Sequence, residues 1–110
     1  MAVDVQILPE ARAELDSLPQ RERDAVANAI FKLQELGDAL GYPHSSQVQG
    51  TVLRELRPRQ GRSPWRAFYL RRGGRVFVVA AVGSEAVHNP RRFRRAIADA
   101  QARLAALEPE

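Results

Sequence analysis

One carboxylate and two arginines fall at positions that a small antiparallel sheet would bring together. Glu55 and Arg57 are separated by one residue in LRELRP (residues 53–58), so they lie on one face of a predicted strand. Arg66 follows in WRAFYL (residues 65–70), which is typical of the next strand. Side chains on one face of neighbouring antiparallel strands approach within about 5 Å. Two guanidiniums beside one carboxylate can hold a phosphodiester and move a proton. In the alternative, Glu55 only neutralises its neighbours in a cross-strand ion pair, a common and weak surface interaction.

A second basic group begins the predicted last helix and consists of Arg91, Arg92, Arg94 and Arg95. Asn89 followed by Pro90 is typical of a helix N-cap and first helical residue. Cations there oppose the helix dipole, each by roughly 0.3–1 kcal/mol. A bound anion would relieve that repulsion, so we expect these four arginines to contact a phosphate backbone. The alternative is a solvated basic face.

Two histidines and three further arginines complete the candidate residues. His88 directly precedes the last helix, and imidazole is the usual proton carrier at neutral pH. It is either a catalytic proton carrier or an incidental surface residue, and the same alternatives hold more weakly for His44. The remaining arginines expected to contact nucleic acid are Arg54, Arg59 and Arg62.

The charge of the chain is strongly polarised. Twelve of its sixteen arginines lie in residues 54–95 with only two acids, Glu55 and Glu85, which gives that stretch a net charge of +10. The first 50 residues hold four basic and eight acidic side chains. A basic half of this kind favours a polyanionic partner, and guanidinium groups bind phosphate oxygens with two aligned donors.

Length and composition exclude several classes of protein. The 110 residues predict a single domain spanning 1–110 with one hydrophobic core. There is no cysteine, no histidine–carboxylate spacing for a metal, no phosphate-binding glycine loop and no serine or cysteine nucleophile motif, so we expect neither metal nor cofactor. No signal-peptide pattern and no membrane span of about 20 apolar residues is present, so we expect a soluble cytoplasmic protein.

Hydrophobic periodicity predicts the elements that position these residues. Val3, Val5 and Ile7 alternate as in a strand, whereas the apolar residues after Pro9 and Pro19 recur at helical spacing, and Pro19 is expected at the first position of its helix. The polar residues 44–51 are expected to be a flexible loop. The remaining predicted elements are strands at 52–57, 65–70 and 76–82 and a helix from Pro90 through Leu107. Their order is β-α-α-β-β-β-α, an α+β fold in which an αα-hairpin and a C-terminal helix pack on a small, mostly antiparallel sheet.

The same segments resemble the RelE/ParE toxin superfamily, most closely its HigB-like, phage Gp49-like branch. The segments that carry the resemblance are LPQRERDAV (18–26), LGYPHS (40–45), LRELRP (53–58), WRAFY (65–69), FVVAAVG (77–83) and NPRRFRRA (89–96). They span nearly the whole chain, and the element order predicted above is also that of the superfamily.

The resemblance implies a toxin of a type II toxin–antitoxin pair and a metal-independent endoribonuclease that cleaves mRNA, possibly on the ribosome. In such enzymes the ribose 2′-OH attacks the adjacent phosphorus, so no protein nucleophile is needed. By position, Arg57 and Arg66 would stabilise the phosphate and Glu55 or His88 would move protons. The implied partner is a helix-turn-helix antitoxin. Two alternatives remain open, an inhibitor of DNA gyrase like ParE relatives and a non-catalytic nucleic-acid-binding module.

Overall fold

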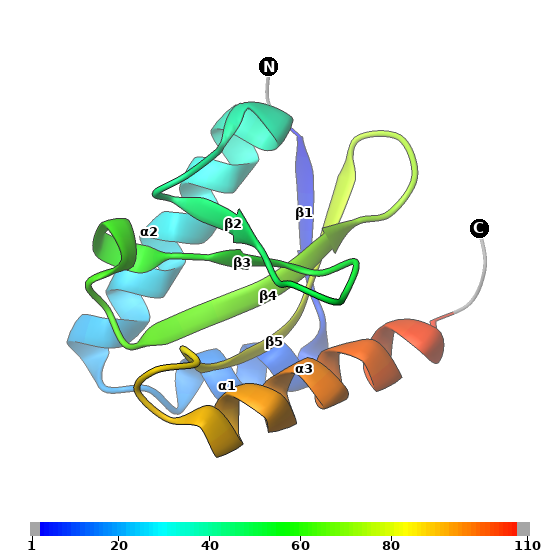
Figure 1. Ribbon diagram of the computed structural model, residues 1–110. Coiled ribbons are helices and arrows are strands. Elements are labelled where there is room, and N and C mark those ends of the chain that lie inside the picture. Colours follow the sequence, from blue (N-terminus) through cyan, green and yellow to red (C-terminus); the bar gives the residue numbers. More distant parts are fainter. Residues whose placement is uncertain (1–2, 108–110) are drawn as a thin grey trace.

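The computed structural model describes residues 3–107 and contains one five-stranded sheet between two layers of helix (Figure 1). Its elements are β1 (Asp4–Ile7), α1 (Pro9–Asp16), α2 (Gln20–Leu36), η1 (Gly37–Ala39), β2 (Ser45–Gln47), β3 (Arg54–Leu56), η2 (Pro58–Gly61), β4 (Trp65–Arg71), β5 (Val76–Ser84) and α3 (Pro90–Ala105). The strand order is β1-β5-β4-β3-β2, with β1 parallel to β5 and the other neighbours antiparallel. The α+β class and the mostly antiparallel sheet are therefore confirmed.

Each face of the sheet carries its own hydrophobic cluster. Residues of α1 and α2 pack with Tyr69 and Phe77 on one face, whereas α3 packs with Phe68 and Ala81 on the other. Because β5 is an inner strand contacted by helices from both sides, its residues are apolar almost throughout, as the sequence predicts. The αα-hairpin and the C-terminal helix thus lie on opposite faces of the sheet.

The predicted elements need four corrections at their boundaries. Ser45–Gln47 forms the edge strand β2 against β3, although residues 44–51 were expected to be flexible. The predicted strand 52–57 pairs only over Arg54–Leu56. Pro19 is the N-cap of α2 and not its first helical residue. The last helix ends at Ala105, before Leu107. Local pattern does not place element ends to better than one or two residues, and the pairing of β2 with β3 is a tertiary contact.

The ion pair between Glu14 and Arg103 satisfies the hydrogen-bonding groups of the β5 backbone beyond the end of β1. The pairing of β1 stops at Val79, so the next backbone groups of β5 have no neighbouring strand on that side. Arg103 Nη1 donates to the carbonyl of Ala80 at 3.0 Å, and the N–H of Val82 donates to Glu14 Oε1 at 3.0 Å. The hydrogen bond with Glu14 raises the pKa of Arg103 and joins α1 to α3 across this edge.

Close packing against Gly83 sets the position of α3. A Cβ at Gly83 would lie 2.6 Å from the Cβ of Ala96, a separation that two methyl groups cannot adopt. Helix α3 therefore approaches the sheet where a strand residue has no side chain. The N-terminus of this helix is fixed by Asn89, whose side chain accepts from the N–H of Arg92 at 3.1 Å, so the predicted N-cap is confirmed.

We predict that Gly83→Ala lowers the free energy of unfolding by about 1–3 kcal/mol, because the added methyl group overpacks the helix–sheet contact. Urea denaturation measures this change. Gly41→Ala is the matched control, since nothing lies within 4 Å of its added Cβ and it should be neutral or slightly stabilising. The double variant Gly83→Ala/Ala96→Gly should recover part of the loss. A Gly83→Ala protein as stable as wild type would contradict the close packing.

Candidate functional site

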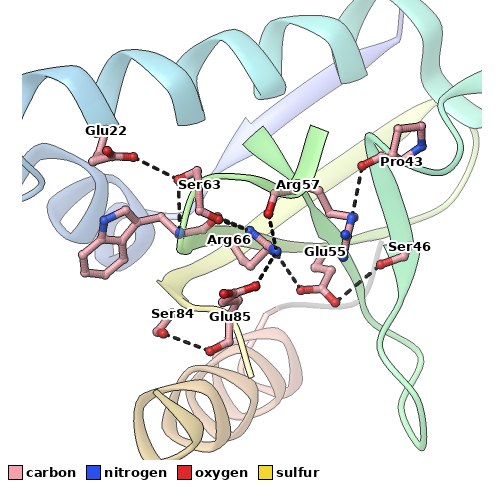
Figure 2. Close-up of polar contacts among 11 residues, drawn as sticks. Glu22, Pro43, Ser46, Glu55, Arg57, Ser63, Arg66, Ser84 and Glu85 are labelled. Carbon is pink, nitrogen blue, oxygen red and sulfur yellow. Dashed lines mark hydrogen bonds and ion pairs between the residues drawn. The ribbon is translucent and has the colours of Figure 1, made fainter. Parts of the chain in front are cut away.

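Arg66 lies almost fully buried on the α3 side of β4, with 1% of its surface exposed. Its Nη1 donates to the backbone carbonyls of Ser63 at 2.6 Å and Trp65 at 3.0 Å. Its Nη2 donates to a Glu85 oxygen at 2.8 Å, and its Nε lies 3.2 Å from Glu55 Oε1 (Figure 2). The Nε contact is an ion pair without the alignment of a hydrogen bond. Nη2 also donates to the carbonyl of Gly61 at 3.4 Å, so two carboxylates and three backbone carbonyls surround this guanidinium.

Burial lowers the pKa of Arg66, while the negative charges of Glu55 and Glu85 oppose that shift. Because an arginine side chain is not deprotonated in proteins, the guanidinium remains charged at neutral pH. The carboxylates are less buried, with side-chain exposures of 14% for Glu55 and 29% for Glu85. The charge of Arg66 thus holds two partly accessible carboxylates at fixed positions.

This geometry corrects the expectation that Arg66 binds a phosphate directly. The cross-strand register does bring Glu55 to Arg66, as predicted, because Glu55 pairs with Phe68 and lies diagonal to Arg66 on one face. However, the guanidinium is enclosed by its protein partners and presents no open surface to a ligand. The sequence alone could not give this, because Glu85 comes from the end of a different strand.

Arg57 lies beside this cluster and is half-buried. Its Nε donates to the carbonyl of Pro43 at 3.1 Å, and its guanidinium carbon lies 5.1 Å from the centre of the Tyr42 ring. Gly61 has a φ angle of 91°, which favours glycine, and a Cβ there would fall 2.5 Å from Nη2 of Arg57, so the Arg57 side chain would have to shift. Its positive charge also contributes to lowering the pKa of Arg66, which indicates that the two guanidiniums are near one another.

The loop next to Arg57 is anchored to α2 by Glu22. Arg59 forms an ion pair with Glu22, and Ser63 Oγ donates to the same carboxylate at 2.9 Å (Figure 2 shows Glu22 and Ser63). The hydrogen bond from Arg59 lowers the pKa of Glu22. Arg59 and Gln60 adopt positive φ angles of 54° and 59°, which cost free energy in non-glycine residues. The Glu22 contacts offset that cost and hold η2 beside the cluster.

The other predicted nucleic-acid contacts divide into engaged and exposed side chains. Arg54 donates to Ser45 Oγ at 3.1 Å and is half-buried, and Arg59 is paired with Glu22 as described. In this conformation both side chains are engaged by these protein partners and not available to bind a phosphate. Among these candidates the exposed arginines are Arg62, Arg91, Arg92, Arg94 and Arg95. The four arginines at the start of α3 therefore form an accessible basic surface.

The segment between β5 and α3 carries both Glu85, which contacts Arg66, and His88. Ser84 is buried and donates to the carbonyl of Glu85 at 2.9 Å, and the N–H of Asn89 donates to the same carbonyl at 3.2 Å. These contacts close a compact turn from which Glu85 reaches Arg66. The His88 imidazole is exposed on this turn, three residues beyond Glu85. The structure shows no contact between His88 and Glu55 within the described residues.

Two residues of the site were not among the sequence candidates. Glu85 forms the closer ion pair with Arg66, and its signal was available as one of only two acids in the basic half of the chain. Tyr42 lies against Arg57, and only the three-dimensional fold reveals that contact. Within residues 3–107, no group of three or more side chains is arranged to hold a metal ion. None of the described helices has both the length and the apolar character to span a bilayer.

Comparison with known proteins gives a consistent assignment. Residues 13–105 match the family model described as "Phage derived protein Gp49-like (DUF891)". None of the curated proteins matches the chain. Among solved structures, a chain of the toxin–antitoxin complex RelBE2 from Mycobacterium tuberculosis is similar with a TM-score of 0.58 and 22% identity, covering 77% of this chain and 100% of that one. A mutant of the toxin RelE from E. coli in the free state gives a TM-score of 0.61 and 18% identity, covering 89% of this chain and 97% of that one.

We predict that Arg66→Ala lowers the free energy of unfolding by about 3 kcal/mol, because it leaves two neighbouring carboxylates without their cation. Chemical denaturation at neutral pH measures the loss. Arg62→Ala is the control, since that side chain is exposed and donates only to the carbonyl of Arg59, and it should change stability by less than about 0.5 kcal/mol. Equal stabilities of the two variants would show that Arg66 does not organise the cluster.

Proposed function

The chain belongs to the Gp49-like family of phage-derived proteins and has the fold of RelE toxins, and from this premise we propose that it is a toxin that cleaves mRNA. One observation supports this most: the partly exposed Glu55 carboxylate is held by buried Arg66 next to the half-buried Arg57. A fixed base beside a cation is what attack by an internal hydroxyl requires.

In the proposed reaction the ribose 2′-oxygen bonds to the adjacent phosphorus and the bond from phosphorus to the 5′-oxygen breaks. Glu55 accepts the proton of the 2′-hydroxyl, and Arg57 stabilises the additional negative charge on the phosphorane oxygens. His88, exposed on the turn that also carries Glu85, donates a proton to the leaving 5′-oxygen. The products are a 2′,3′-cyclic phosphate and a 5′-hydroxyl, and the reaction needs neither metal nor cofactor.

Arg66 acts in this scheme as a positioning residue. Its guanidinium is enclosed by protein acceptors, so it affects the reaction by holding the Glu55 carboxylate in a fixed position. Ser46 donates to the other oxygen of Glu55 at 3.4 Å and restricts the carboxylate further. The second acid, Glu85, contributes to balancing the charge of Arg66 through its ion pair with Nη2.

The RNA backbone would be held by the exposed arginines of α3. Arg91, Arg92, Arg94 and Arg95 start in the first turn of that helix, directly after the turn that carries His88. Phosphate contacts of this kind position a substrate without reading its sequence. We propose cytoplasmic mRNA, either free or on the ribosome, as the substrate of a HigB-like enzyme.

A toxin of this type requires an inhibitor, and we propose a helix-turn-helix antitoxin as the partner. The RelBE2 structure is itself a toxin–antitoxin complex, and the chain similar to ours belongs to it. The basic surface of the chain favours an acidic segment of such a partner.

One observation favours a second candidate function. Because Arg66 is sealed by its partners, Arg57 is the only cation of the Glu55, Arg57 and Arg66 group that a phosphate could reach in the described structure. A site with a single accessible cation suits binding better than cleavage, so a non-catalytic nucleic-acid-binding module is the alternative. No feature of the described residues specifically favours inhibition of DNA gyrase.

We predict that induction of the wild-type chain arrests growth and creates new 5′ ends in cellular transcripts. Arg57→Ala should reduce the frequency of these ends by about a hundredfold, because about 2.7 kcal/mol of transition-state stabilisation is lost. Mapping of transcript 5′ ends measures this, with Arg21→Ala on the exposed face of α2 as the control that should cut normally. DNA damage without new transcript ends would identify a gyrase inhibitor. The absence of both DNA damage and new transcript ends would identify a binding module.

A further inference from the structure

A groove of about 350 Å³ lies between α2 and residues 57–59, and Arg57 is one of its lining residues. Its floor consists of the small or aliphatic side chains of Ala25, Ala29 and Leu40. Phe31 borders it and is 59% exposed, so its ring extends the apolar surface of the groove. The groove therefore offers apolar surface that the chain itself does not cover.

The rim of this groove is basic. Lys32, Arg57 and Arg59 line it together with His44, and none of its ten lining residues carries a carboxylate. Arg59 is neutralised in part by Glu22, but neither Lys32 nor Arg57 forms an ion pair in residues 3–107. This contrasts with the acidic excess of the first 50 residues, to which α2 belongs. The local charge is thus complementary to an anionic ligand.

The groove also has the shape that a helix requires. Ala25, Ala29 and Lys32 follow one another at four- and three-residue spacing, so they form one stripe along α2. Small side chains in that stripe let a second helix approach closely, while Phe31 and the η2 loop form the two sides. Amphipathic helices bind such grooves through apolar side chains at this same spacing.

We propose that this groove binds an acidic amphipathic helix of a protein partner, with one or two large apolar side chains on the alanine and leucine floor and carboxylates on Lys32 and Arg57. The inference rests on the proposed function, because a toxin must have an inhibitory partner. RNA fits less well, since single-stranded RNA is held by stacking on flat rings and the floor here is aliphatic.

Arg57 connects the groove with the candidate site. It lines the groove and also lies beside the Arg66 cluster, so a carboxylate that pairs with Arg57 removes the cation that would stabilise the phosphorane. The partner would then inhibit by charge neutralisation and would not need to cover Glu55. This gives the bound helix an effect on cleavage that is separate from blocking access of the RNA.

The test uses a fluorescent helical peptide of about 18 residues, with leucines at three- and four-residue spacing and glutamates beside them. Fluorescence anisotropy with the full chain should show binding that weakens with salt, and a peptide with lysine for each glutamate should bind at least tenfold more weakly. Lys32→Glu should reduce affinity for the acidic peptide by about tenfold, equal to about 1.4 kcal/mol. Arg21→Glu, a charge reversal on the same helix outside the groove, should stay within about twofold of wild type.

A second matched pair of variants tests the groove without changing a core residue. Asn28 and Ala27 are neighbouring exposed residues of α2, and only Asn28 lines the groove. Asn28→Trp should abolish peptide binding, whereas Ala27→Trp should leave it intact. The proposal is overturned if the acidic and the lysine peptide bind equally, or if Asn28→Trp binds the acidic peptide like wild type. It is also overturned if the acidic peptide never binds and Asn28→Trp instead loses binding of an RNA oligonucleotide.

Cleavage assays of the same proteins separate this inference from the proposed function. Without peptide, Asn28→Trp should cleave RNA like wild type, and the acidic peptide should inhibit wild type but not Asn28→Trp. A wild-type chain that binds the peptide but never cleaves RNA would refute the proposed function and support the proposed binding groove. A wild-type chain that cleaves RNA but does not bind the peptide would refute the binding groove and support the proposed function.

Discussion

A buried positive charge is stable only when protein groups replace its hydration, and this constraint organises the centre of the molecule. The Arg66 guanidinium obtains its partners from three segments: the loop before β4, strand β3 through Glu55, and the turn after β5 through Glu85. Each of these segments must keep its place for the charge to remain satisfied. The same contacts fix the direction of the Glu55 carboxylate, so stability and the proposed chemistry depend on one side chain.

The basic helix is positioned by contacts that are independent of this cluster. Gly83 admits α3 close to the sheet, and the ion pair between Glu14 and Arg103 joins it to α1 across the unpaired edge of β5. Short separation between the end of β5 and the start of α3 then places the exposed arginines beside the turn that carries Glu85 (Figure 1). Substrate binding and the proposed proton transfers are thus brought together by the β5–α3 connection.

The sequence predicts those parts of the fold that local pattern determines. Alternation and helical spacing give the main strands and helices, and Asn89-Pro90 gives the start of α3, because these signals are contained within a few residues. The edge strand Ser45–Gln47 is missed, since its polar residues become a strand only by pairing with β3. The contact between Glu55 and Arg66 follows from strand register, but the burial of Arg66 does not. Burial depends on Glu85 and on the backbone carbonyls of a loop, which no spacing rule reveals.

We propose that Arg66 holds Glu55 as the base for attack by the 2′-hydroxyl. Chemical analysis of the RNA ends produced in a translating cell-free extract tests this role. Wild type should produce 2′,3′-cyclic phosphate and 5′-hydroxyl ends, and Glu55→Gln should produce them at least about a hundredfold more slowly. Equal rates for the two proteins, or wild-type cleavage that leaves 5′-phosphate ends, would contradict it.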